Sequence, residues 1–303
     1  KTVTCLDVSE NEGFWDYNQQ FDLSDPSSCR FVIPEGKAEI FLREGYMNLS
    51  DLSGLPLVVE EFESEATRIT AMANTFNSGD KEALSNAIST ARTIVNAAED
   101  YLTVYAQIAA IKSAAKNFLA SATLSEDLDV TAAYITNPEF DRFAIGWRLP
   151  MIMDNIGYNP NIYTNENYQI DHFVEAWRPG SLDNGLFSQT ITNLPAGIYR
   201  LECDAIATWQ EDASVEVTGV SLFAGTQTKA MATENEHPQH FTLSFENLTT
   251  RDVNIGVILK NTNAHWVAMD NIRLYYVGKA ADIPQGTDLV SDADASLDRK
   301  SVV

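Results

Sequence analysis

The chain has 303 residues, and 43 Asp and Glu residues against 20 Lys and Arg give it a formal net charge of −23. This length predicts two or three domains with sizeable cores, and the acidic excess argues against binding to nucleic-acid phosphates or anionic membrane surfaces. No stretch approaches the roughly 18 consecutive apolar residues of a membrane-spanning helix, and Lys1 opens no signal-peptide pattern. We therefore expect a soluble chain or a mature fragment.

Residues 1–54 are predicted to form a β-rich N-terminal segment. The runs 31–33 and 38–42 are β-prone, and each is followed by a turn signal, which indicates two strands joined by a tight turn. Cys5 and Cys29 could form a disulfide across a loop of this segment in an oxidising compartment, or both could stay free. The chain's three cysteines are too few for a disulfide scaffold and lack the spacing of a zinc or iron–sulfur site.

Residues 55–125 are predicted to form a three-helix bundle, because apolar residues recur every three or four positions. The first helix starts near Pro56, Ser78 or Asp80 can cap the second, and a turn near 96–100 separates the second from the third. The apolar stripes are rich in alanine, which permits close helix packing. The polar residues between the apolar positions of the first helix include Glu60, Glu61, Glu63 and Arg68.

Residues 126–278 are predicted to form an antiparallel β-sandwich. The apolar period changes to two, with turn signals every eight to twelve residues, and about eight strands fill a two-sheet jelly roll. Cys203 falls on the apolar side of one strand and is expected in the core. The expected strands are 168–177, 186–192, 198–209, 217–224, 239–245, 253–259 and 265–276, with one or two more before 165. Residues 279–303 have the composition of a linker or tail.

An ordered series of short motifs resembles a known family. The series comprises TNPEFD at 136–141, GW at 146–147, FSQ at 187–189, LPAGIY at 194–199, VSLFA at 220–224 and WVAMDNIRL at 266–274. It resembles the galactose-binding-like jelly-roll modules of large secreted and surface proteins of Bacteroidetes, relatives of the calcium-containing carbohydrate-binding modules. In that group an Ala-rich helical segment often precedes the jelly roll. The resemblance covers about half of the chain and implies the fold more strongly than the function.

The resemblance implies carbohydrate binding and a structural calcium ion. In the modules concerned, calcium is held near the first and last strands, and the matching acids here are Asp141 and Asp270. Calcium prefers several oxygen ligands, some of them backbone carbonyls, so two acids far apart in sequence can suffice in a folded sandwich. A different role for Asp270, capping a strand or pairing with Arg273, stays open.

Tryptophans near loops are the candidate sugar-binding residues, because carbohydrate recognition places flat aromatic rings against sugars and polar groups against hydroxyls. Trp147 and Trp266 lie inside the motifs and are expected in the core. Trp209 ends a predicted strand and leads into a polar loop with Gln210 and Glu211, and it is the favoured candidate. Trp177 followed by Arg178 is the second.

Other sites receive less support from the sequence. Tyr158 and Tyr163 are weaker candidates, because they lie in an Asn-rich stretch, 155–167, of the kind that usually forms turns. The four histidines lack metal-ligand spacing, and no nucleophile elbow, phosphate-binding loop or dinucleotide fingerprint occurs. A glycosidase needs two acids held about 5 to 10 Å apart, which the sequence neither excludes nor indicates.

Three hypotheses therefore stand at this stage. The favoured one is non-catalytic binding of a polysaccharide or other glycan by a secreted, cell-surface or periplasmic bacterial protein. The second is a structural or adhesion module that binds protein partners and carries an exposed apolar patch. The third is a glycoside hydrolase or an accessory domain of one, with two facing carboxylates in a deep pocket.

Overall fold

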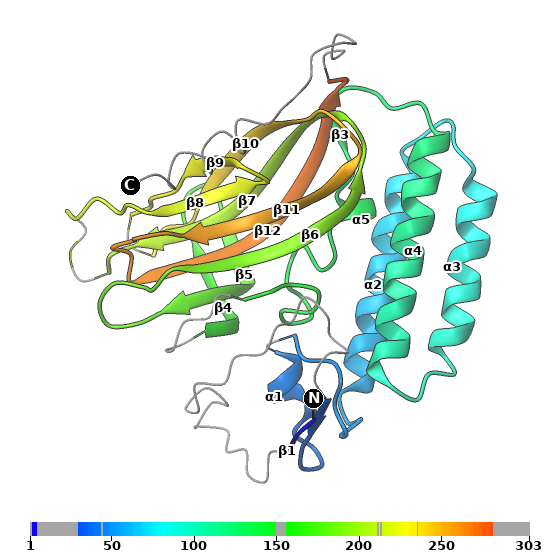
Figure 1. Cartoon of the computed structure of the whole chain (residues 1–303), viewed down its shortest axis with the longest axis horizontal. Coiled ribbons are helices and arrows are strands. Elements are labelled where there is room, and N and C mark those ends of the chain that lie inside the picture. Colours follow the sequence, from blue (N-terminus) through cyan, green and yellow to red (C-terminus); the bar gives the residue numbers. More distant parts are fainter. Residues whose placement is uncertain are drawn as a thin grey trace, which may run out of the picture.

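The computed structural model describes residues 2–4, 30–43, 45–149, 156–210, 212, 214–234 and 236–280. These residues form a β-sandwich with a layer of helices along one side (Figure 1). Cys5, Cys29, Glu211 and the expected tail lie outside the described residues, so the question of a Cys5–Cys29 disulfide stays open.

The N-terminal segment contains one short helix where a strand was predicted. β1 (Thr2–Thr4) pairs in parallel with β2 (Arg30–Val32), but Ala38–Leu42 is the helix α1. The strand prediction was wrong because a distant carboxylate favours the helix: Asp51 Oδ2 accepts the backbone N–H groups of Lys37 and Ala38, each at 2.8 Å. These N–H groups have no partner within a helix, so the carboxylate caps it.

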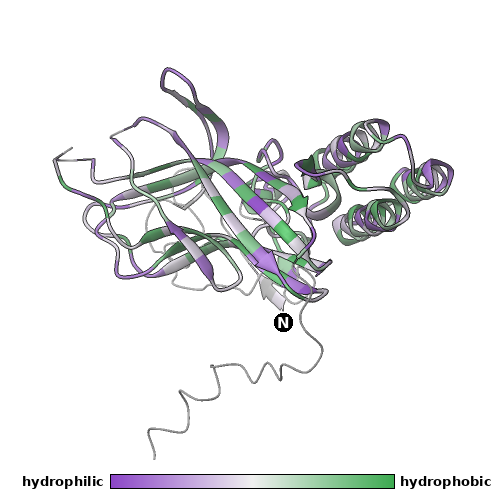
Figure 2. Ribbon diagram, turned by 90° about the horizontal axis from the view of Figure 1, so that it is seen from above, coloured by the Kyte–Doolittle hydropathy of each residue, from purple (hydrophilic) through white to green (hydrophobic). Residues whose placement is uncertain are grey.

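Three longer helices follow, α2 (Leu55–Asn74), α3 (Lys81–Val95) and α4 (Tyr101–Ser121). Asp80 caps α3 through the N–H of Ala83, and Asp100 caps α4 through the N–H of Thr103. The turn expected near 96–100 is therefore present. The helices run side by side beside one end of the sandwich (Figure 2), with α4 in contact with both others.

The sandwich consists of two antiparallel sheets, which confirms the predicted β-sandwich. One sheet has the order β10-β7-β12-β5-β4, with β3 paired to β12, and the other has the order β6-β11-β8-β9. The predicted strands agree with the observed ones within three residues at each end. The bounds are β3 Leu128–Asp129, α5 Thr131–Tyr134, β4 Ile156–Thr164, β5 Gln169–Trp177, β6 Gly185–Leu194, β7 Gly197–Thr208, β8 Val220–Ala224, β9 Gln227–Ala230, β10 Gln239–Asn247, β11 Arg251–Leu259 and β12 Trp266–Gly278.

The main core lies between the sheets and extends under the helices. Alternate residues of β7 point into it, and Leu201, Cys203 and Ala205 are completely buried. Cys203 is thus the core residue that the alternation predicted, and burial raises the pKa of its thiol. The same alternation appears in the hydropathy colours along the strands (Figure 2).

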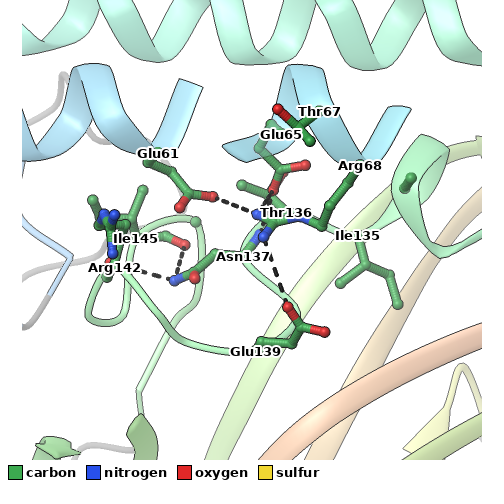
Figure 3. A network of polar contacts seen from close by, with 12 residues as sticks. Glu61, Glu65, Thr67, Arg68, Ile135, Thr136, Asn137, Glu139, Arg142 and Ile145 are labelled. Carbon is green, nitrogen blue, oxygen red and sulfur yellow. Dashed lines mark hydrogen bonds and ion pairs between the residues drawn. The ribbon is translucent and has the colours of Figure 1, made fainter. Parts of the chain in front are cut away.

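Charged residues of α2 join the helices to the sandwich (Figure 3), together with Lys112 of α4. Glu61 and Glu65 are completely buried, and Arg68 pairs with both at 3.1 Å. Glu65 also pairs with Lys112 of α4 and accepts the N–H of Asn137 at 2.6 Å. The sequence pattern placed Glu61 and Arg68 between apolar positions but gave no sign of this cluster.

The protonation of the two glutamates differs because their partners differ. Burial and the neighbouring Glu65 carboxylate raise the pKa of Glu61 well above its usual range. Burial alone would also raise the pKa of Glu65, but the charges of Lys112 and Arg68 lower it below the ordinary value. Glu65 is therefore the ionised member of the pair.

The loop between α5 and β4 completes this junction. Asn137 Nδ2 donates to the carbonyl of Phe143 at 2.8 Å, and the Trp147 indole donates to the carbonyl of Thr136 at 3.0 Å. Trp147 is 2% exposed, as expected for a core tryptophan. The family-like motif at 136–147 therefore builds a folded joint between the helices and the sandwich.

Candidate functional site

A second apolar cluster lies on the outer face of the sheet β10-β7-β12-β5-β4. It contains Ile170, Phe173, Ile206, Trp266 and Ala268, with Tyr163 and Trp177 packed at its margin. Val267 and Met269 belong to the main core instead. Because successive side chains of a strand point to opposite faces, Trp266 and Ala268 face away from the sandwich interior. The sheet thus carries aromatic residues on a face that the other sheet does not cover.

Sheet register brings Trp177 next to Trp266 and places Gln210 close by. Trp266 of β12 lies opposite Trp177 of β5 on one side and Thr208 of β7 on the other. The Trp177 indole N–H donates to Gln210 Oε1 at 2.5 Å. Two predicted site residues that lie 33 positions apart in the chain therefore meet at this end of the outer face.

The Glu175 carboxylate accepts two hydrogen bonds at the aromatic cluster. Its Oε2 accepts the Trp266 indole N–H and its Oε1 accepts Asn159 Nδ2, both at 2.6 Å. Trp266 is 2% exposed, as expected, and its ring centroid lies 4.9 Å from that of Tyr163. Burial raises the pKa of Glu175, although both hydrogen bonds oppose this shift. The sequence analysis missed Glu175, although alternation in β5 places it on the same face as Trp177.

The segment that carries Tyr163 is a strand, β4, where the Asn-rich composition indicated turns. A register shift between Asn159 and Ile162 bends β4 against β5. A β-bulge of this kind turns the strand. The Tyr163 ring packs at 5.8 Å from Phe173 as well as against Trp266. Tyr163 is therefore part of the outer cluster, which the composition of 155–167 did not reveal.

Trp209, the favoured candidate of the sequence analysis, packs on the other side of the sheet. It is half-buried against the main core, and its ring centroid lies 3.5 Å from that of the buried His265. Trp177 packs instead against the outer cluster. The two predicted tryptophans thus contact different cores.

Arg178 lies at the edge of this site, on the loop that follows β5. Its Nη1 pairs with Asp183 Oδ2 at 2.6 Å, and its backbone N–H donates to the carbonyl of His265. The ion pair directs Arg178 to its own loop. Glu211 lies outside the described residues.

The opposite end of the outer face is polar. His240 Nδ1 lies 2.8 Å from Asp204 Oδ1, and Asn271 Nδ2 donates to Asp204 Oδ2 at 3.0 Å. Tyr168, which is 38% exposed, stacks on His240 with ring centroids 5.5 Å apart. This end combines an exposed flat ring with hydrogen-bonding groups of both kinds.

The two acids expected to hold calcium lie in different surroundings. Asp270 is 1% exposed, and its two oxygens accept the backbone N–H groups of Asp171 and Asn271. Burial raises the pKa of Asp270 to about 8. Asp141 is exposed in the loop before β4. Among the described residues, no three His, Cys, Asp or Glu side chains are grouped to hold a metal ion.

Comparisons with known proteins found similarity in solved structures alone. No protein-family model and no curated protein matches the chain. Among the described residues, no helix is long and apolar enough to cross a membrane.

The similar structures include carbohydrate-binding modules and a cyclase. One is a CBM61 module in complex with β-1,4-galactotriose, with 18% identity and a TM-score of 0.34, covering 50% of this chain and 99% of that one. Another is the CBM22-1 xylan-binding domain of Paenibacillus barcinonensis Xyn10C, with 10% identity, a TM-score of 0.31 and coverage of 47% and 93%. The third is a cyclase from Fischerella sp. TAU, with 15% identity, a TM-score of 0.36 and coverage of 48% and 97%. Because these proteins differ in what they do, the likeness assigns none of their roles to this chain.

Proposed function

We propose that the protein binds a glycan, without catalysis, on the outer face of the sheet β10-β7-β12-β5-β4. The observation that best supports this proposal is the hydrogen bond between Trp177 and Gln210 beside the aromatic cluster. Trp177 is half-buried, so part of its ring stays accessible at the end of the face. A flat ring packs on the C–H face of a sugar, and an amide such as that of Gln210 can bond its hydroxyls.

The polar end of the same face supports this proposal. Tyr168 offers a second exposed ring, and the Asp204 carboxylate with Asn271 offers an acceptor and a donor. Accessible rings at both ends of the face suit a chain of sugar units that contacts the two ends, because the cluster between them is at most 2% exposed. Arg178 and Glu211 remain candidates at the margin of the site.

The state of the buried acids argues for binding without hydrolysis. Glu175 and Asp270 are the acids of this face whose pKa is raised, as a general acid requires. Both oxygens of each carboxylate already accept hydrogen bonds from protein donors. Neither acid is thus presented to a bound sugar.

A structural calcium ion finds little support in the residues present. Calcium needs ionised or carbonyl oxygens that are free to turn toward it. Both oxygens of Asp270 already accept backbone N–H donors. Asp141 and Asp270 therefore do not fit a calcium site in this arrangement, and we derive no role for the ion.

We also propose a more specific fold type and a cellular location for the protein. The order of the family-like motifs supports a jelly roll of the galactose-binding-like type, preceded by a three-helix bundle, in a secreted, surface-displayed or periplasmic bacterial protein. The adhesion alternative requires a contiguous apolar patch. Large exposed apolar side chains among the described residues are instead spread over several elements, with Ile94 on α3, Ile162 on β4 and Leu248 after β10.

A binding screen with matched variants tests the function. The full-length chain is titrated by calorimetry with a panel of neutral and acidic polysaccharides, together with Trp177→Ala and Trp209→Ala. We expect Trp177→Ala to weaken binding at least about tenfold and Trp209→Ala to have a smaller effect. Binding to no member of the panel, or binding that Trp177→Ala leaves unchanged, would contradict the proposal.

A further inference from the structure

A cavity of about 420 Å³ lies between α4 and the sandwich, away from the outer face. Four residues of α4 line one side, namely Tyr105, Ala109, Lys112 and Lys116, which share a helix face. Strand β6 from Leu186 to Thr192, Asn254 of β11 and parts of the loop 134–148 line the rest. Its volume lies in the range of small-molecule sites, which is about 300 to 1,000 Å³.

The charge of this lining is opposite to that of the protein. Lys112, Lys116 and Arg148 border the cavity, and none of its lining residues is Asp or Glu. Over the whole chain, acidic residues outnumber basic ones by 43 to 20. In such an acidic chain, a cavity whose charged lining residues are all basic attracts an anion electrostatically.

Lys116 is the cation that remains for a ligand. The charge of Lys112 is balanced by Glu65, and its amine also donates to the carbonyls of Ala132 and Ile135. The Lys116 amine donates to the carbonyl and the hydroxyl of Thr192, at 2.9 and 2.8 Å, and both of these are neutral groups. No carboxylate in the described part of the chain forms an ion pair with it. Burial and the like charge of Lys112 lower the pKa of Lys116, and the charge of Asp252 opposes this shift.

Further polar side chains line the cavity together with this amine. The Lys116 amine lies 5.4 Å from the ring centroid of Tyr134. Tyr105 and Tyr134 line the cavity, and the hydroxyl of neither forms a hydrogen bond to another described residue. The Thr190 hydroxyl bonds Asn254 Oδ1 at 2.6 Å, so the amide NH₂ of Asn254 remains as a further donor. Donors of this kind complement oxyanions.

We propose that this cavity binds a small molecule carrying a carboxylate or sulfate group, with the anionic group at Lys116. A sugar acid or a sulfated monosaccharide has a suitable size and presents hydroxyls to Tyr105, Tyr134 and Asn254. The proposal is independent of the glycan site on the outer face, because the two sites share no residue.

Titration of the full-length chain with three probes tests the proposal. Glucuronate, glucose 6-sulfate and glucose are compared by calorimetry at low and high NaCl. We expect saturable binding of at least one anionic probe, weakened by salt, and no binding of glucose. Binding of glucuronate alone would identify the carboxylate as the ligand group, and binding of glucose 6-sulfate alone would identify the sulfate.

Variants locate the site. Lys116→Gln should weaken binding of the anion at least about tenfold, the order of one charged hydrogen bond. Lys229→Gln on the exposed β9 and Trp177→Ala on the outer face should leave it unchanged. If Lys116→Gln does not fold, Tyr134→Phe serves instead and should weaken binding severalfold. Equal binding of glucose and the anions, no binding of any probe, or full affinity in the cavity variant would overturn the proposal.

Discussion

Glu65 of α2 and Lys112 of α4 form an ion pair in which both side chains are almost completely buried. Without Lys112, Glu65 keeps Arg68 as its charged partner, but the buried carbonyls of Ala132 and Ile135 lose the amine that donates to them. We expect Lys112→Met to lower the free energy of unfolding by about 3 to 5 kcal/mol, measured by urea denaturation. The half-exposed pair Glu63–Arg92 provides the control, because Arg92→Met should cost no more than about 1 kcal/mol. Equal costs for the two variants would show that burial of the pair is unimportant.

The Tyr101 hydroxyl ties the start of α4 to the start of α2. It donates to the carbonyl of Asp51 at 2.8 Å and accepts the N–H of Gly54 at 3.1 Å, and the residue is 1% exposed. Tyr101→Phe leaves both backbone groups without this partner, so we expect a loss of about 1 to 3 kcal/mol in the free energy of unfolding. Tyr105→Phe, one turn later, removes a hydroxyl that has no hydrogen-bond partner among the described residues and should change stability little. A smaller loss for Tyr101→Phe than for Tyr105→Phe would refute this account.

The raised pKa of Asp270 predicts that the folded chain loses stability as the pH rises. Burial raises its pKa in the folded chain to about 8, whereas the unfolded group ionises near the ordinary value of 3.8. Its contribution is therefore complete below about pH 4 and is lost progressively toward pH 8. Asp270→Asn cannot ionise, although its NH₂ group faces one of the two backbone N–H donors, so its melting temperature should fall between pH 4 and pH 9 by at least about 2 °C less than that of the unmodified chain.

The comparison between variants separates Asp270 from other groups. Glu61 also has a raised pKa and acts in the same direction, so the pH profile of the unmodified chain alone does not identify Asp270. The difference between Asp270→Asn and the unmodified chain should grow from pH 4 to pH 8, whereas Glu166→Gln on the surface should show no such growth. A constant difference across this range would assign the pH effect elsewhere.

The face on which each tryptophan lies predicts unequal effects on glycan binding. Trp177 packs against the outer cluster and Trp209 against the main core. Trp177→Ala should therefore reduce affinity for a bound polysaccharide at least about tenfold, and Gln210→Ala should reduce it by a smaller factor. Trp209→Ala should chiefly lower the melting temperature, which a thermal scan beside the titration measures. A larger affinity loss in Trp209→Ala would move the site to the other face of the sheet, on the side of the main core.

Local patterns predicted the regular elements well and failed where a distant residue decides. The helix break at 96–100 and the cap at Asp80 follow from signals a few residues apart. Helix α1 was missed because its cap, Asp51, lies 13 positions beyond Ala38. β4 is one of the one or two strands expected before 165, but its position was not predicted because its many asparagines indicated turns, whereas the Asn159 side chain hydrogen-bonds Glu175 of the next strand.

In the candidate site, one contact could not be predicted from local patterns, whereas the position of one tryptophan could have been. Trp177 and Gln210 meet only through the register of three strands, which the sequence does not contain. The position of Trp209, however, could have been predicted. Leu201, Cys203, Ala205 and Ala207 alternate into the main core, and Trp209 continues that series.

The polar joint at Ala132, Ile135 and Asn137 has a consequence for how this protein can be divided or recombined. The amine of Lys112 bonds the carbonyls of Ala132 and Ile135, and the Glu65 carboxylate accepts the N–H of Asn137. Without the helices, these three backbone groups would lose their hydrogen-bond partners. Without the sandwich, the charged side chains of Lys112 and Glu65, which are buried in the whole protein, would be exposed. Neither half is therefore a self-sufficient building block, and a graft into another protein must carry both.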